Sequence, residues 1–289
     1  MNRLTFSLLL LLGMLATARA QLDVSLEMKR HYFMRGEPIE ATVVIRNLAG
    51  KDVMLRDADG NQWFGFQITK GSDTPVGPLV ADYKNDPQVI LSGGSIRRSI
   101  DLLKLYPIND YGTYTVRAAV YFQEAGKFIT SGAIKMDVSE GRKLWTQTVG
   151  VPGAKDGAGE YHLVSLLSFQ QPRETTLYAR VEDEASGSVL CTYPLGRYVG
   201  GTTPGHEFDR ENTLHVFQLV GPKQYFLSKI GVNGEWLGQT SWHSEEGRAA
   251  VRLKQDGRMV IVGAKRTVDT PPPGPEVPRL SDRPMALPK

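Results

Sequence analysis

The sequence predicts an all-β protein. Short runs of alternating apolar and polar residues recur along the chain, and they are rich in Val, Ile, Thr, Tyr and Phe, which favour strands. Turn residues separate these runs, and the chain contains 30 Gly and 17 Pro. The sequence after residue 21 shows no sustained apolar period of about 3.6 residues, which would indicate an amphipathic helix. The length of 289 residues fits two domains and flanking segments.

Residues 1–20 have the composition of a secretory signal peptide. Arg3 precedes an apolar run over 4–15, and small residues follow as far as Ala20. The run is shorter than the roughly 20 residues of a membrane-spanning helix. We expect cleavage after Ala20 and a secreted or periplasmic protein without a membrane span. Loss of Arg3 and Arg19 lowers the formal net charge by two, from +3 to +1. This charge favours no nucleic-acid partner.

The first predicted domain covers residues 22–139. Period-two patterns between turn residues indicate strands over 24–28, 39–47, 64–69, 95–101, 112–123 and 133–138. In the longest uninterrupted pattern, Ala41, Val43 and Ile45 share one face of the strand.

Asp110, Gly112 and Tyr114 form a D-x-G-x-Y pattern at the start of the strand over 112–123. With "GEPI…VVIRN" and "YGTYTVRA", it resembles the strand openings of bacterial immunoglobulin-like sandwiches. In such sandwiches the tyrosine hydroxyl hydrogen-bonds to upstream backbone, and antibody domains carry a cysteine two residues further on. Val116 stands at that position here, so the resemblance implies a sandwich without a disulfide. It implies little about function, and Tyr114 as an inward residue of another β fold stays an alternative.

The second predicted domain covers residues 140–267 and reads as an antiparallel β-meander. Strands are indicated over 177–183, 188–193, 214–220, 224–230, 236–242, 248–253 and 258–262. Asn233-Gly234 and Asp256-Gly257 favour tight hairpin turns. The pattern weakly resembles the hairpin repeats of β-propellers, but a closed ring needs typically four to eight four-stranded blades. An open meander, a small barrel and a sandwich all remain possible for this length.

Residues 268–289 form a Pro-rich tail, because seven of the 17 prolines fall within 269–289. Such a segment cannot form strand ladders or helices, so we expect it to be disordered. A polyproline ligand for a partner is the alternative.

The sequence predicts no catalytic residue, no cofactor and no metal ion. The five histidines lack zinc-site spacing. Glu207, Asp209 and Glu211 offer oxygens, but without the spacing of a calcium loop. Cys191 has no partner for a disulfide, and we expect a buried, unreactive thiol.

Tyr225, Trp236 and Trp242 are the candidate ligand platform. The two tryptophans are six residues apart and share one face if the strand is unbroken. Exposed together with Tyr225, they could bind a sugar or a peptide. The alternative is that all three fill the core.

These observations favour a non-enzymatic secreted or periplasmic binding protein, with an unknown protein or carbohydrate ligand. One alternative is a carbohydrate-active enzyme or its accessory binding module, because paired carboxylates need no local motif. Another is an envelope assembly component or a protein inhibitor acting through exposed strand edges.

Overall fold

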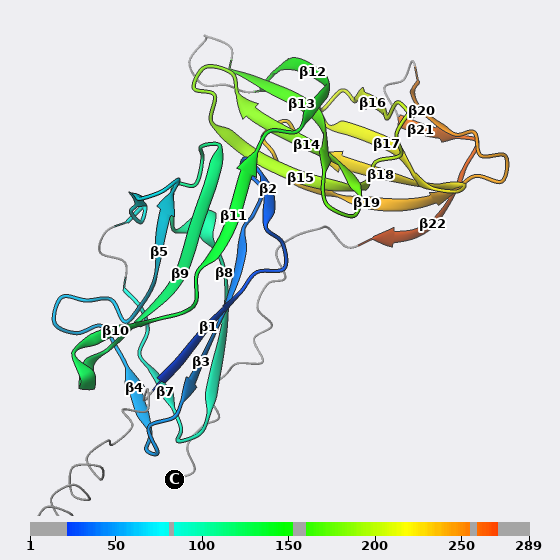
Figure 1. The fold of residues 1–289 in the computed structure, drawn as a ribbon. Helices are drawn as coiled ribbons and strands as arrows, with labels where there is room; N and C mark the ends of the chain where they lie inside the picture. Colours follow the sequence, from blue (N-terminus) through cyan, green and yellow to red (C-terminus); the bar gives the residue numbers. More distant parts are fainter. Residues whose placement is uncertain (1–21, 81–83, 153–159, 255–258, 271–289) are drawn as a thin grey trace, which may run out of the picture.

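The computed structural model describes residues 22–80, 84–152, 160–254 and 259–270 (Figure 1). Apart from two single-turn 3-10 helices, η1 (Leu102–Lys104) and η2 (Gln123–Ala125), every regular element in these ranges is a strand. This confirms the all-β prediction. No helix in the described ranges is long and apolar enough to cross a membrane. The predicted leader, 1–20, and residues 271–289 of the predicted tail lie outside the described residues. Residues 268–270 of that tail belong to the strand Lys265–Thr270 and pair with residues 239–241, so the expectation that the tail forms no strand ladder is wrong for these three residues.

The first half of the molecule, residues 22–139, contains two sheets around one core. The first sheet has the order β1 (Leu22–Glu27), β3 (Glu40–Asn47), β8 (Ser95–Asp101). The second has the order β2 (Tyr32–Met34), β11 (Ile134–Ser139), β9 (Gly112–Phe122), β5 (Phe64–Lys70), β6 (Thr74–Val76), with β10 (Lys127–Thr130) also paired to β9. A separate ribbon joins β4 (Val53–Leu55) and β7 (Gln88–Ile90). The pairing is antiparallel except between β2 and β11.

Apolar alternation fixes which strand faces point inward in this half. Ala41, Val43 and Ile45 of β3 are fully buried, as their shared face predicts. They pack against side chains from the opposite sheet, including Tyr114 and Val116 of β9. Removing these apolar surfaces from water is what holds the two sheets together.

The D-x-G-x-Y segment forms a corner at the start of β9. The Tyr114 hydroxyl donates to the Asp110 carbonyl oxygen at 2.8 Å, which is the backbone bond that the sequence resemblance implies. The Asp110 carboxylate accepts from Lys70 Nζ at 2.9 Å. Gly112 has a φ of 137°, a conformation that favours glycine.

The second half, residues 142–270, consists of two meanders that pack on each other (Figure 1). One sheet contains β12 (Arg142–Gly150), β13 (Tyr161–Gln170), β14 (Thr175–Asp183) and β15 (Val189–Arg197) in sequential order. The other contains β16 (Gly205–Phe208), β17 (Leu214–Gly221), β18 (Gln224–Ile230), β19 (Trp236–His243) and β22 (Lys265–Thr270). A ribbon joins β20 (Ala250–Leu253) and β21 (Met259–Val262). The antiparallel meander is confirmed, and small antiparallel sheets are the part of the propeller resemblance that the structure supports.

A tight turn of the first half lies against β14 and β15 of the second. A Cβ atom on Gly36 would come within 2.3 Å of Val189 Cγ1, so only glycine fits this contact. The carbonyl oxygen of Arg35 accepts from Thr192 Oγ1 at 2.8 Å and from Arg180 Nη2 at 3.2 Å. The turn backbone is therefore held by side chains of the other half.

Two buried charged side chains, Glu37 and Arg180, form further hydrogen bonds and ion pairs beside this turn. Glu37 accepts from the Tyr178 hydroxyl at 3.1 Å and pairs with Arg30 at 2.7 Å. The Arg180 guanidinium pairs with Glu140 at 2.8 Å. Glu37 and Arg180 are each only 1% exposed. Buried charges are tolerated only when they are paired, so this network requires the two halves to meet in one arrangement.

Candidate functional site

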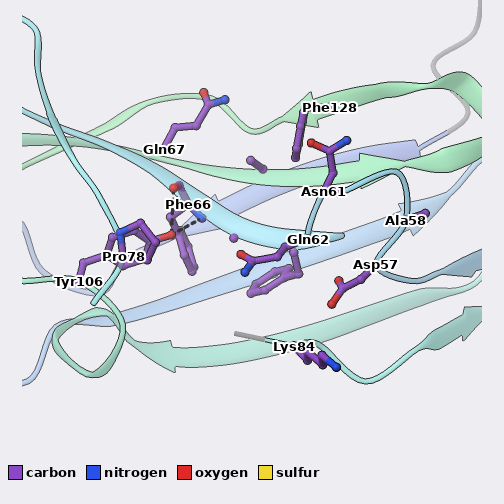
Figure 2. A pocket seen from close by; sticks show the side chains of 14 residues that line it. Asp57, Ala58, Asn61, Gln62, Phe66, Gln67, Pro78, Lys84, Tyr106 and Phe128 are labelled. Carbon is purple, nitrogen blue, oxygen red and sulfur yellow. Dashed lines mark hydrogen bonds between the residues drawn. The ribbon is translucent and has the colours of Figure 1, made fainter. Parts of the chain in front are cut away.

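A groove of about 610 Å³ lies beside the first part of β5 (Figure 2). It exists because β6 pairs only with Ile68–Lys70 and leaves the preceding residues of β5 at the sheet edge. Its floor includes Gly65 and Ala119, which are cross-strand partners with little or no side chain. The volume lies in the range of ligand-binding clefts, which is roughly 300–1,000 Å³.

The backbone at this edge is already hydrogen-bonded. The Tyr106 hydroxyl accepts from the Phe66 N–H at 2.9 Å and donates to the Phe66 carbonyl at 3.0 Å. Figure 2 shows the Tyr106 side chain beside Phe66, where its hydroxyl reaches the Phe66 backbone. The Asn85 amide donates to the Phe64 carbonyl at 3.1 Å. A partner strand would have to displace both side chains before it could pair here.

The groove lining includes side-chain amides, one exposed ring and two charged residues, Asp57 and Lys84. Asn61, Gln62 and Gln67 supply the amides, and Figure 2 shows them around the hollow with Phe128. The Phe128 side chain is 44% exposed. Its ring packs against Tyr121 at a centroid distance of 5.1 Å, so a well-supported aromatic surface faces the groove.

Asp57 is the only acid among the described residues that line the groove. One of its carboxylate oxygens accepts from the Trp63 N–H at 2.8 Å, and the other accepts from the Asn85 N–H at 3.0 Å. Both oxygens thus bind backbone of neighbouring loop segments. The carboxylate shapes the groove wall by fixing these segments.

The structure separates the predicted aromatic platform. Tyr225 pairs with Trp242 across β18 and β19, but a β-bulge lies between the pairs Lys229–Gly238 and Ile230–Trp236. The bulge turns Trp236 to the opposite face, so the expectation that both tryptophans share one face is wrong.

The three platform residues pack into two different apolar clusters. Trp236 packs against Tyr193 at a centroid distance of 5.1 Å, between the two sheets of the second half. Tyr225 is buried and stacks on Phe217 at 5.0 Å, with Trp242 in the same outer cluster. A ligand role for Tyr225, Trp236 or Trp242 stays a prediction.

Cys191 and Asp209, which the sequence analysis considered for reactivity and metal binding, have structural surroundings. Cys191 is buried, and desolvation raises the pKa of its thiol to about 12, which disfavours the reactive thiolate. Asp209 accepts from His215 Nε2 at 2.8 Å and from the Thr213 N–H at 2.9 Å. Its oxygens therefore stabilise the loop before β17.

Comparison with known proteins assigns no family to the chain. No family model matches it, and no curated protein matches it. Among solved structures, the sporulation control protein Spo0M from Bacillus subtilis is similar at 11% sequence identity and a TM-score of 0.29. The similarity covers 86% of this chain and 91% of that chain. We draw no conclusion about fold or function from a similarity this low.

Proposed function

We propose that the protein is a non-enzymatic binding protein that acts outside the cytoplasm, and that the groove beside β5 binds a neutral carbohydrate. The observation that carries this proposal is the lining of the groove. Three side-chain amides and an exposed Phe128 ring surround a floor of small residues, at an edge where both backbone groups of Phe66 and the Phe64 carbonyl are already bonded.

The lining matches the chemistry of sugars. An amide side chain offers both a donor and an acceptor, as a sugar hydroxyl does. The two charged residues of the lining, Asp57 and Lys84, have opposite signs, and Asn61, Gln62 and Gln67 add no charge, so the lining carries no formal net charge, which suits an uncharged ligand. An exposed aromatic ring such as Phe128 provides an apolar surface for the C–H face of a sugar ring.

Peptide binding by strand addition is disfavoured at the same place. That mode depends on free backbone N–H and C=O groups at a sheet edge. The Tyr106 hydroxyl occupies both groups of Phe66, and the Asn85 amide occupies the carbonyl of Phe64. Recognition by side chains is left as the route to binding.

The hydrogen bonds of Asp57 favour binding without catalysis. Most glycoside hydrolases use two carboxyl groups, one of which donates a proton and one of which attacks or activates water. Both Asp57 oxygens already accept backbone N–H bonds, and Asp57 is the only acid among the described residues that line the groove, so this lining offers no pair of carboxyl groups. A carbohydrate-active enzyme is the alternative that the experiment below addresses.

The proposal includes an immunoglobulin-like first half and export by the leader. Two sheets around one core and the Tyr114–Asp110 bond support the immunoglobulin-like sandwich. The signal-peptide composition of residues 1–20 supports a secreted or periplasmic location.

The test is binding to a panel of neutral oligosaccharides and polysaccharides, followed by titration calorimetry on the best ligand. Phe128→Ala should weaken binding about tenfold, which corresponds to the loss of one aromatic contact. Tyr32→Ala is the matched control, because Tyr32 is also an exposed aromatic strand residue of the first half, at 45% exposure. It should bind like the wild type.

Failure of the wild-type protein to bind any neutral glycan would contradict the proposal, as would equal losses in both variants. Release of reducing sugar from the bound glycan would favour the enzyme alternative.

A further inference from the structure

Three side chains of metal-binding type meet at one end of the β13–β14 pair. His162 of β13 lies directly opposite Asp183, the last residue of β14. Glu160 is two residues before His162, and alternate residues of an extended chain share a face. One imidazole nitrogen and one oxygen of each carboxylate all lie within 4.8 Å of one another.

The orientation of the His162 ring is fixed by the neighbouring sheet. His162 is 3% exposed, and its Nδ1 lies 2.7 Å from the carbonyl oxygen of Val232. A carbonyl only accepts hydrogen bonds, so Nδ1 carries a proton and donates it. In the neutral ring, Nε2 then presents its lone pair to Glu160 Oε1 at 3.3 Å. Metal-binding histidines are commonly held by the same kind of backbone bond from their other nitrogen.

The separation of two of these ligand atoms suits a small divalent ion. In a tetrahedral zinc site, bonds of about 2.0–2.1 Å place neighbouring ligand atoms about 3.3–3.4 Å apart. The observed separation of 3.3 Å between His162 Nε2 and Glu160 Oε1 matches this value. Asp183 is held in place through Oδ1, which accepts from the Ser186 N–H at 2.6 Å and the Ser186 hydroxyl at 2.5 Å. The Glu160 side chain is 51% exposed, which gives access from solvent.

We propose that Glu160, His162 and Asp183 bind one divalent transition-metal ion, with Zn²⁺ as the best fit and water as the fourth ligand. An imidazole in the ligand set favours zinc over calcium or magnesium, which prefer oxygen ligands alone. Because His162 also bonds to Val232, the ion would link the end of the β13–β14 pair to the turn that follows β18. A bound ion would therefore stabilise the packing of the two meanders.

The test uses the full mature chain without a histidine tag, treated with a chelator and then titrated with ZnCl₂ in a calorimeter. We expect one ion per chain. Glu160→Gln removes one ligand from an exposed position and should weaken binding about tenfold or more. Glu184→Gln is the matched control: it makes the same charge change at an exposed turn residue directly after Asp183 and outside the cluster, and it should bind like the wild type.

A second readout is the thermal midpoint of unfolding with and without Zn²⁺. Zinc should raise the midpoint of the wild type and of Glu184→Gln, and it should have little effect on Glu160→Gln and Asp183→Asn. Absence of zinc binding by the wild type would overturn the proposal. Equal affinities of the wild type and Glu160→Gln would also overturn it. The groove beside β5 lies in the other half, so glycan binding does not bear on this outcome.

Discussion

The two halves of the molecule fill their interiors differently. Among the described residues, the first half buries only three polar or charged side chains, those of Glu37, Asn47 and Ser131. The second half buries eleven, namely His162, Ser165, Ser168, Thr176, Arg180, Thr192, His215, Gln218, Ser228, Gln239 and Ser244. The first half is thus held together mainly by apolar packing, whereas the second also depends on hydrogen bonds between its sheets.

A row of four aromatic rings is an example of the apolar packing in the first half. Trp63, Phe64, Phe66 and Tyr106 follow one another at centroid distances of 5.5, 5.6 and 6.2 Å. Such contacts are non-directional, apart from a modest preference for tilted rings, and scale with buried area.

The backbone carbonyl of Leu195 is an example of the hydrogen bonding between the sheets of the second half. The carbonyl oxygen of Leu195 accepts from Gln218 Nε2 at 2.6 Å and from Gln239 Nε2 at 2.9 Å. Gln239 also donates to Ser228 Oγ at 2.8 Å. These bonds join β15 to the facing sheet, and their geometry specifies how the two sheets align.

The largest expected change in stability comes from removing a buried aromatic side chain in the first half. Trp63→Ala should lower the free energy of unfolding by about 3–5 kcal/mol, because Trp63 is fully buried and its loss leaves a cavity. Urea unfolding measures the change. Val89→Ala, at a position 54% exposed in the same half, should change stability by less than about 0.5 kcal/mol. A small loss in Trp63→Ala would mean that apolar packing does not dominate this half.

A non-additive effect is expected in the polar half. Gln239→Met should cost about 1 kcal/mol, because Gln218 still satisfies the Leu195 carbonyl. Adding Gln218→Met leaves that carbonyl buried without a donor, which costs about 1–3 kcal/mol more than the sum of the single changes. The double-mutant cycle is measured by urea unfolding. Simple additivity would show that the two amides act independently.

The smallest expected change in stability concerns Asp209, and it depends on pH. Burial acts to raise the pKa of Asp209, but hydrogen bonds from His215 and from the Thr213 N–H outweigh it, and the pKa is lowered. The ionised carboxylate therefore stabilises the folded state above the unfolded pKa of about 3.9, and this stability is lost as the pH falls through the folded pKa. Asp209→Asn should be less stable than the wild type by about 1 kcal/mol at pH 7.

The difference should narrow as the pH falls below about 4, measured by urea unfolding across the pH range. Asp73→Asn, at an exposed position of the first half, is the control and should stay close to the wild type at each pH. A pH-independent gap for Asp209→Asn would show that shape rather than charge makes Asp209 important.

The same contrast explains what the sequence could predict. The strand expected over 39–47 matches β3, because one of its faces is consistently apolar. The pattern did not indicate β13, in which Val164 to Phe169 are all buried, because a strand covered on both faces does not alternate. It did not indicate β12 either, whose residues are mostly polar and exposed.

The groove could not be predicted from local patterns. Gly65 within a strand is a weak signal of a hollow or a close approach. However, Asn61, Tyr106 and Phe128 come from separate segments, and only the register of β5, β9 and β10 brings them together. The bulge that separates Trp236 from Trp242 likewise depends on the pairing of β18 with β19.

The Tyr106 hydroxyl also has a consequence for colloidal behaviour. An uncovered strand edge rich in aromatic residues is a nucleus for polymerisation into amyloid-like fibres. One phenol oxygen satisfies both peptide groups of Phe66 and so protects the sheet from templating a second copy. A phenylalanine at position 106 would preserve the packing of the ring, but it would leave both peptide groups of Phe66 free to pair with a strand of a second copy.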